Sequence, residues 1–221
     1  MGFSSSQLKV IALLSMLIDH IGVGIISKLY GYNRVYWLTR VIGRTAFPIY
    51  CFLLVEGVSK TGNRRRYVRD LLVFAIISEL PMDIMVGTSW EAQNVYWTLL
   101  LGAVMLMLLE NTTEIRWFWH FIVVLITVSL SETLRTDYGV YGILMMYAMY
   151  ILKKRRALML CASYFILSVL YLEEWSLPAF LFIGAYNGKR GFIHGKIKYI
   201  FYWFYPIHLL VITLIRITLA V

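Results

Sequence analysis

Residues 8–27 read LKVIALLSMLIDHIGVGIIS, an apolar run that carries an acid and a histidine in its interior. A helix needs about 20 mostly apolar residues to cross a membrane. The run lacks the small-residue cleavage site that ends a signal peptide, so we expect it to remain in the protein as a first membrane helix.

The apolar character of this run continues through the whole chain. Of the 221 residues, 60% are hydrophobic, 16% are aromatic and only 15% are charged. A soluble domain carries about 25% charged residues. The composition therefore excludes an ordinary soluble enzyme, a disordered tail and a small disulfide scaffold. We predict an all-α, polytopic membrane helical bundle that forms a single transmembrane domain over residues 1–221.

The membrane helices are predicted from the lengths of the apolar runs. About nine are expected, and because the fourth, sixth and eighth are short, the count lies between eight and ten. The expected segments are 8–27, 36–58, 67–86, 95–110, 117–134, 139–152, 157–172, 174–186 and 199–220.

Basic turns predict the orientation of the chain. Residues 60–66, 153–156 and 187–198 are rich in Lys and Arg and all follow even-numbered segments, so they share one side. The positive-inside rule makes that side cytoplasmic, with the N-terminus. Acidic residues such as Glu173 lean outward. The net charge of +9 then reflects orientation and anionic lipid, and we expect no nucleic acid partner. The predicted location is the bacterial cytoplasmic membrane, crossed several times.

Several ionisable residues fall inside the expected membrane helices. Each charge costs at least about 2.5–3.5 kcal/mol at the bilayer centre, so it faces a partner or a water-filled cavity. With a rise of about 1.5 Å per residue, four helices bring such groups to a similar depth. This predicts a shared site. The ionisable residues inside the expected helices are Asp19, His20, Arg40, Arg44, Glu56, Glu79, Asp83, His208 and Arg216. Those expected at the similar depth are the two acids Glu79 and Asp83, the two arginines Arg40 and Arg44, and the two histidines, whereas Glu56 lies near the inner end of its helix.

The two histidines are candidates for proton transfer. Histidine is the side chain best suited to exchange a proton near neutral pH, and His20 stands beside Asp19 near the expected midplane. The alternative for both His20 and His208 is a structural histidine bonded to a backbone carbonyl. Pro206, just before His208, would free such carbonyls.

Arg40 and Arg44 have two interpretations. Their i, i+4 spacing puts them on one face of a helix. They either neutralise the acids of neighbouring helices, with Asp19 able to face Arg44, or one of them holds an anion or a developing oxyanion. Pro48 is expected to bend this helix beside Arg44.

Further polar residues are candidates for binding a substrate. Glu79 and Asp83 flank a proline and fit a binding role or an ion-pair scaffold equally well. Asn94, Asp137 and Tyr138 stand where the fourth and sixth helices begin. The alternative there is that Asn94 and Asp137 cap the helix starts.

The sequence also lacks several common catalytic motifs. It has no Walker loop, no His-Glu-x-x-His and no Gly-x-Ser-x-Gly, and Cys51 and Cys161 fall inside apolar runs without a Cys-x-x-Cys. We therefore predict no bound metal, no ATP and no covalent serine.

Ordered blocks over nearly the whole chain resemble one known family. They are Leu8-Lys9-Val10-Ile11-Ala12, Asp19-His20-Ile21-Gly22, Arg40-x-Ile42-Gly43-Arg44-x-Ala46-Phe47-Pro48-Ile49, Glu56-Gly57, Ile77-Ser78-Glu79-Leu80-Pro81, Asp137-Tyr138-Gly139-x-x-Gly142 and Tyr205-Pro206-x-His208. The chain thus resembles the TraX family of conjugal transfer proteins. That resemblance implies acetylation of the N-terminus of a pilin subunit, and a distant similarity to the membrane acyltransferase family 3.

The wider acyltransferase group carries a basic residue, ten intervening positions and a histidine in its first helix, as Lys9 and His20 do here. The resemblance implies that His20 is a general base or proton shuttle and that Arg44 holds the thioester or oxyanion. It further implies that Asp19 orients nearby charge. No pilin or conjugation-specific extension is visible, so the acceptor stays open.

The leading hypothesis is a membrane acyltransferase that uses acetyl-CoA from the cytoplasm. Its acceptor would be a protein N-terminus, or a glycan or lipid hydroxyl, reached from the outer side. The expected catalytic residues are His20, Asp19, Arg44 and His208. Substrate-binding candidates are Arg40, Glu79, Asp83, Asn94, Asp137 and Tyr138, and candidates for the acetyl-CoA phosphates are Lys9, Arg64, Arg65, Lys153 and Lys189. The main alternative is a proton-coupled transporter or channel, because buried Asp, Glu, Arg and His also serve proton relays.

Overall fold

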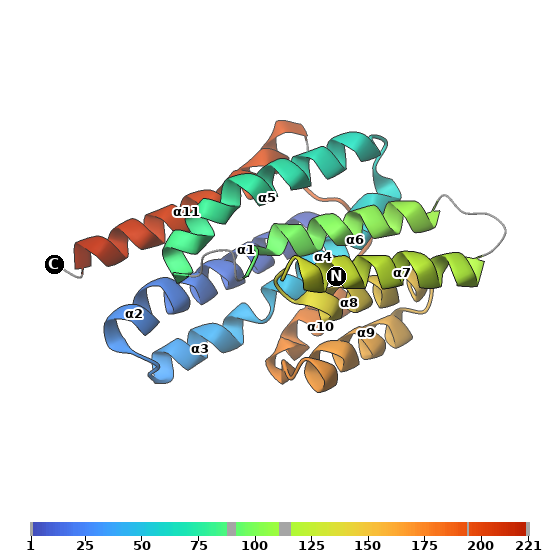
Figure 1. The fold of residues 1–221 in the computed structure, drawn as a ribbon. Coiled ribbons are helices and arrows are strands. Elements are labelled where there is room, and N and C mark those ends of the chain that lie inside the picture. The colour runs from blue at the N-terminus through green and yellow to red at the C-terminus, as the bar shows by residue number, and fades with distance from the viewer. Residues whose placement is uncertain (1, 88–91, 111–115, 194, 220–221) are drawn as a thin grey trace. The chain divides into compact units, whose positions relative to one another are not determined.

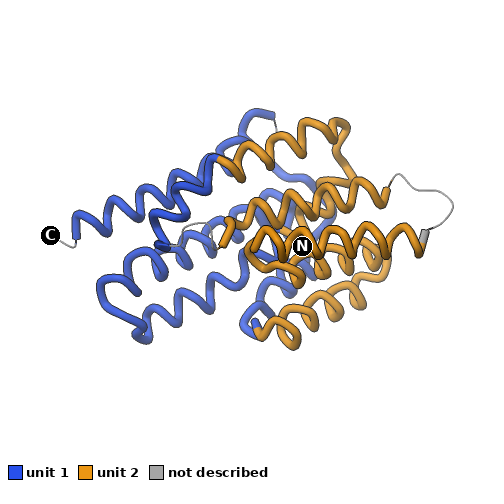
Figure 2. The backbone as a smooth tube through the Cα atoms, viewed as in Figure 1, with its two compact units in different colours: residues 1–50, 77–89, 173–221 blue, residues 51–76, 90–172 orange. Residues whose placement is uncertain are grey.

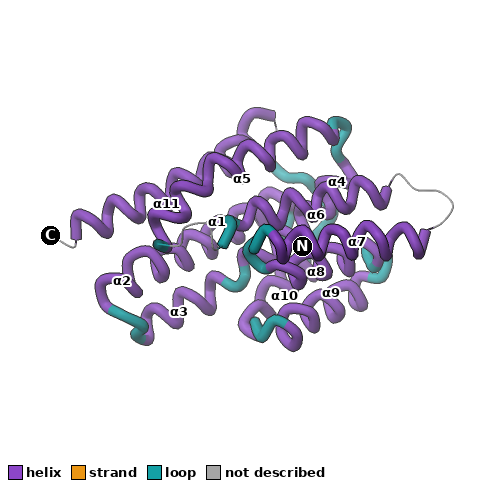
Figure 3. The backbone as a smooth tube through the Cα atoms, in the orientation of Figure 1, coloured by secondary structure: helices purple, strands orange, loops and turns teal. Residues whose placement is uncertain are grey.

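The computed structural model describes residues 2–87, 92–110, 116–193 and 195–219. Helices make up nearly all of this part of the chain (Figure 3). Over the same residues no strand forms, and two isolated β-bridges join Phe3 to Tyr186 and Gln93 to Thr136. The all-α prediction is confirmed.

Each of the nine expected segments corresponds to a helix or to a helix with a break in it (Figure 1). A π-helical turn, Gly22–Ile26, joins the first two helices, and a second one, Ile166–Leu170, extends the ninth. The α-helices are α1 Ser5–Ile21, α2 Ser27–Tyr30, α3 Arg34–Gly43, α4 Ala46–Lys60, α5 Arg64–Val86, α6 Val95–Glu110, α7 Arg116–Thr133, α8 Gly139–Ile151, α9 Arg156–Phe165, α10 Leu177–Gly184 and α11 Lys198–Leu219.

Three helical stretches in the described chain are long and apolar enough to cross a membrane. They are Ser5–Tyr30, Arg34–Lys60 and Gly195–Leu219. Shorter apolar helices account for most of the remaining expected spans, namely Val95–Glu110, Trp117–Thr133, Gly139–Ile151 and Arg156–Leu170. The chain is therefore a membrane protein, while the count of about nine spans stays a prediction.

The chain divides into two compact units (Figure 2). Unit 1 comprises residues 1–50, 77–89 and 173–221, and unit 2 comprises residues 51–76 and 90–172. In unit 1, α1 packs against α3 and α11. In unit 2, α6, α7 and α8 pack against one another, and α9 packs on α8. The prediction of a single transmembrane domain stays a prediction.

The N-terminal residues are bound to the segment that follows α10. Ser4 and Gln7 form a capping box at the start of α1. The Phe3 N–H donates to the Ala185 carbonyl over 2.9 Å, and the Ser5 N–H donates to the Lys189 carbonyl over 2.8 Å. Residues 187–190 of the basic segment therefore lie beside the start of α1. The membrane side on which they lie stays a prediction.

The second expected span is broken in the middle. It forms α3 and α4, which are separated by a turn at Arg44 and Thr45. Pro48 is the third residue of α4, where a proline is tolerated because the first-turn N–H groups have no partner within the helix. The expected bend beside Arg44 therefore occurs as a break before the proline, not as a kink at it.

Glycines let the helices of unit 1 approach closely. A Cβ atom on Gly22 would clash with Thr39 of α3, and one on Gly43 would clash with Asp19 of α1. A Cβ on Gly24 would clash with Ile212 of α11. Small residues at such crossings allow tight packing between membrane helices. The glycines thus set the separation of the three helices that carry most of the ionisable residues.

Gly43→Ala is expected to destabilise the protein by about 1–3 kcal/mol, because the added methyl must displace α1 or the Asp19 side chain. Thermal unfolding in detergent measures this change. Gly62→Ala is the matched control, since a Cβ there meets nothing within 4 Å. Equal melting temperatures for the two variants would contradict the close crossing of α1 and α3.

Candidate functional site

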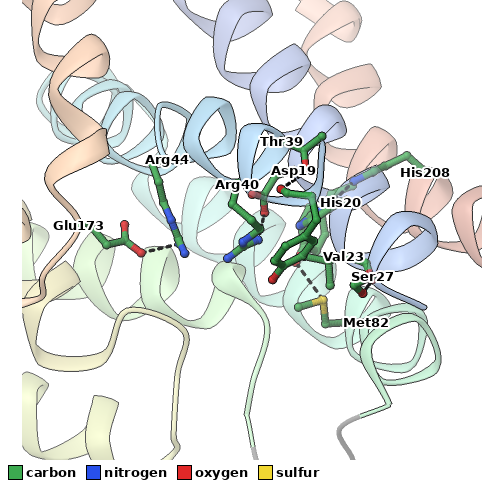
Figure 4. Close-up of polar contacts among 12 residues, drawn as sticks. Asp19, His20, Val23, Ser27, Thr39, Arg40, Arg44, Met82, Glu173 and His208 are labelled. Carbon is green, nitrogen blue, oxygen red and sulfur yellow. Dashed lines mark hydrogen bonds and ion pairs between the residues drawn. The ribbon is translucent and has the colours of Figure 1, made fainter. Parts of the chain in front are cut away.

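Two histidines from opposite ends of the chain meet in unit 1. His20 of α1 and His208 of α11 are joined by a hydrogen bond of 2.6 Å between Nδ1 of His20 and Nε2 of His208 (Figure 4). The Nδ1 atom of His208 lies 2.6 Å from the backbone oxygen of Phe204. His208 is buried and His20 is partly exposed. The sequence predicts that the first and last helices bring ionisable groups to one site, and in the structure the two histidine rings contact each other directly.

This chain of hydrogen bonds assigns the protons on both rings. A carbonyl oxygen only accepts, so Nδ1 of His208 donates to Phe204. In the neutral ring, Nε2 of His208 then accepts, and Nδ1 of His20 is its donor. This leaves the lone pair of His20 on Nε2, an atom that makes no hydrogen bond within the described residues. Nε2 of His20 is therefore the basic atom of the pair.

Aromatic rings surround the histidine pair. The His208 ring stacks on Phe204 with 4.7 Å between the ring centroids. Tyr205 lies edge-on to His20 at 5.8 Å and to His208 at 5.6 Å, and its hydroxyl contacts Met82 Sδ at 3.8 Å. The π-helical turn Gly22–Ile26 begins two residues after His20. Such turns occur often at functional sites.

The neighbouring acid on α1 is paired with an arginine of α3. Asp19 Oδ2 and Arg40 Nη1 lie 2.5 Å apart, and both side chains are mostly buried. The partner suggested from the sequence was Arg44, so that suggestion is wrong. The reason is that Asp19 packs on Gly43, which shares a face of α3 with Arg40 three residues earlier, whereas Arg44 lies in the turn that follows α3.

Arg44 instead forms an ion pair with Glu173. The carboxylate is buried and belongs to the short segment before α10, also in unit 1. From the sequence, Glu173 is expected only as one of the outward acids and not as a site residue. It follows the seventh expected span with no periodicity or motif around it, so no sequence signal marks its partner.

The acids of the third expected span lie on the last turns of α5, in unit 1. Glu79 is half-buried, and one carboxylate oxygen of Asp83, Oδ1, is buried without a hydrogen bond to the described residues. Met82, between them, is the residue that contacts Tyr205 of the histidine cluster. Helix α5 therefore reaches the site as predicted, and the roles of the two acids stay predictions.

The remaining substrate-binding candidates lie in unit 2. Asn94 is fully buried, accepts from the Tyr96 N–H at 3.0 Å and donates to the Ala75 carbonyl at 2.8 Å, so it caps α6 and anchors it. Asp137 accepts from Thr98 through its backbone oxygen. Helix α8 is capped from α7, because Glu132 Oε1 accepts from the Val140 N–H at 2.8 Å.

Tyr138 stands just before α8 with a left-handed φ of 62°, and its ring packs on Tyr171 with 5.4 Å between centroids. A non-glycine residue in this conformation is uncommon and is held by its surroundings. The helix-cap alternative is thus confirmed for Asn94, whereas a substrate role for Tyr138 stays a prediction.

The basic candidates divide between the units. Lys9 and Lys189 lie in unit 1, at the start of α1 and beside it. Arg64, Arg65 and Lys153 lie in unit 2, where Arg64 pairs with Glu110 at 2.7 Å. Lys153 lies 4.9 Å from the centroid of the Tyr150 ring. Their role toward phosphates stays a prediction. Within the described residues, no group of three or more His, Cys, Asp and Glu side chains is placed to hold a metal ion.

The fold and the site define an α-helical membrane protein with a hydrogen-bonded histidine pair beside a mostly buried acid–arginine pair. The chain belongs to the TraX family, whose model, described as TraX protein, matches residues 4–216. The resemblance found in the sequence blocks is therefore confirmed.

A curated relative is similar over most of the chain. The "Probable fimbrial assembly protein FimC, serogroup H1" of Dichelobacter nodosus is 29% identical over 235 residues, covering 94% of this chain and 93% of the relative. No solved structure matches the chain. The similarity to the membrane acyltransferase family 3 stays a prediction.

Proposed function

We propose that this chain is a membrane acyltransferase that moves an acetyl group from cytoplasmic acetyl-CoA to an amine or hydroxyl reached from the outer side. The observation that carries the proposal is the chain from the Phe204 carbonyl through His208 to His20, which leaves Nε2 of His20 as a base. The relative is named as a fimbrial assembly protein. We therefore propose that the acceptor belongs to a fimbrial subunit.

Nε2 of His20 would act twice in the reaction. It first removes the proton from the acceptor N–H or O–H while the acceptor atom bonds to the thioester carbonyl carbon. It then gives that proton to the sulfur as the C–S bond breaks and the carbonyl re-forms. The products are the acetylated acceptor and free coenzyme A, and His20 returns to its starting state. Such acid–base catalysis contributes roughly 10²–10⁴-fold.

His208 would hold His20 in the required tautomer. Its Nε2 accepts the Nδ1 proton of His20, and it stabilises the ring when Nε2 becomes protonated. A base oriented by a third group is the arrangement found in many nucleophile-activating sites. Lys189, whose carbonyl accepts from the Ser5 N–H, and Lys9, in the second turn of α1, would supply positive charge for the phosphates of the donor.

The same histidine pair also fits a proton relay, which is the alternative function. In a transporter both rings would exchange protons with water on the two sides of the membrane. In a transferase Nε2 of His20 exchanges its proton with bound reactants. The two functions therefore differ in what the protein binds and in whether protons cross the bilayer.

The test uses the full chain purified in detergent with acetyl-CoA labelled in the acetyl group and a peptide carrying a fimbrial subunit N-terminus. We expect saturable binding of acetyl-CoA and label transfer to the peptide, detected by mass spectrometry. Hydroxyl acceptors are tested in parallel. Absence of acetyl-CoA binding, together with substrate-driven proton flux in liposomes, would overturn the proposal in favour of the transporter.

A further inference from the structure

We infer that Arg40, not Arg44, binds the acyl oxygen during transfer, with Asp19 as the residue that positions it. The inference rests on the proposed function and deepens it, because His20 alone provides no stabilisation for the negative oxygen that forms at the carbonyl carbon. Positioned hydrogen-bond donors at that oxygen are usually a large contribution to catalysis.

The contact between Arg40 and Asp19 uses one end of the guanidinium group. Nη1 of Arg40 binds Oδ2 of Asp19 at 2.5 Å, and this is the Arg40 side chain's whole set of polar contacts within the described residues. Oδ1 of Asp19 is buried and makes no hydrogen bond to them. The pair is therefore held by a single hydrogen bond and not by the two parallel bonds of a bidentate arginine–carboxylate pair. Because arginine carries five N–H donors, those on Nε and Nη2 remain for another acceptor.

The position of Arg40 is set by rigid neighbours. Asp19 and His20 are consecutive on α1, with side chains about 100° apart around the helix. In the view of Figure 4, Asp19 and His20 lie between Arg40 and His208. Gly43 packs directly on Asp19 and thereby holds α3 close to α1. The guanidinium group is thus held next to the residue that precedes the base.

Burial strengthens the electrostatic interaction of the Arg40 charge with a nearby anion. The side chains of Arg40 and Asp19 are only 21% and 16% exposed. Charges interact more strongly where water is largely excluded. A mostly buried cation that keeps unused donors is suited to an oxygen that becomes negative in the transition state, because Asp19 accepts from only one end of the Arg40 guanidinium group.

Arg44 is less suited to this role. Arg44 forms an ion pair with Glu173, and the Glu173 side chain is only 9% exposed. The pair joins the turn between α3 and α4 to the segment before α10. A buried carboxylate compensates the arginine charge. Arg44 therefore stabilises the fold of unit 1, and the oxyanion role implied by the family resemblance passes to Arg40.

In the transfer step, the acceptor atom bonds to the carbonyl carbon and the π electron pair moves onto the oxygen. The free N–H donors of Arg40 bind that oxygen while His20 holds the acceptor's proton. The electron pair then returns, the C–S bond breaks, and the sulfur takes the proton from Nε2 of His20. Arg40 undergoes no net change.

The experiment measures kcat and KM for acetyl-CoA in Arg40→Gln and in the double variant Asp19→Asn/Arg40→Gln. Arg34→Gln, an exposed position on the same helix, is the matched control. The double variant removes both charges together, so no unpaired carboxylate is left to unfold the site. We expect roughly a 10²–10³-fold loss of kcat in both Arg40 variants, with KM nearly unchanged, and no loss in Arg34→Gln.

The outcomes separate this inference from the proposed function. Wild-type kcat in the double variant would show that Arg40 only neutralises Asp19 and would overturn the inference alone. A raised KM with unchanged kcat would also overturn it, because Arg40 would then bind the donor and not the transition state. Absence of transfer by the wild-type protein would overturn the proposed function and this inference with it.

Discussion

Replacing His20 with alanine is expected to lower acyl transfer by roughly 10²–10⁴-fold, because Nε2 of this ring is the base assigned by the hydrogen-bond chain to His208. Acetyl-CoA binding is expected to persist, since the phosphates would be held at the start of α1, away from the histidine pair. Label transfer under single-turnover conditions measures the first effect, and titration with acetyl-CoA measures the second.

His120→Ala is the matched control for this experiment. His120 lies on α7 in unit 2, where its Nδ1 is 3.2 Å from the Tyr147 hydroxyl, and it takes no part in the proposed chemistry. We expect transfer by this variant to stay near the wild-type rate. Equal rates for His20→Ala and the wild type would contradict the assignment of the base. Joint loss of binding and transfer would instead give His20 a structural role.

Removing Glu173 is expected to cause the largest loss of stability. Glu173→Ala leaves the mostly buried Arg44 charge without its carboxylate, and breaking one side of such a pair costs about 3–5 kcal/mol. Thermal unfolding in detergent measures the effect. Lys60→Ala is the comparison, because the pair of Lys60 with Glu56 is exposed and such pairs contribute about 0–1 kcal/mol.

A second variant tests whether the loss of stability comes from the unpaired Arg44 charge. Arg44→Met/Glu173→Leu removes both charges and fills their volume with apolar atoms, which is often neutral for a buried pair. We expect its melting temperature to return close to that of the wild type. Wild-type melting by Glu173→Ala would show that the ion pair does not stabilise unit 1, and no recovery in the double variant would show that the loss does not come from the unpaired Arg44 charge.

The helices themselves follow from local sequence. Long apolar runs have few ways to satisfy their backbone other than a helix, so the nine expected segments all became helices. Depth along the helix axis also follows from residue count, which is why His20 and His208 were predicted to share a level. Both inferences use only the chain's own periodicity and length.

The pairing of the charges could not be obtained in this way. The i, i+4 spacing of Arg40 and Arg44 predicts a common face but not which acid each one meets. Asp19 meets Arg40 because Gly43 lets α1 and α3 cross at that level, and Glu173 meets Arg44 through a segment far along the chain. Such choices depend on side-chain packing between distant segments.

The amino-acid sequence by itself therefore determined an all-helical membrane protein of the TraX family and the residues that bring charge into its helices, because chain length, hydropathy and motif order are local properties. Only the tertiary structure decided that His20 bonds to His208. It also decided that Arg40 pairs with Asp19, the residue before His20, and keeps unused N–H donors. Those facts depend on how closely three helices approach, and contacts at close-packed glycines set that distance.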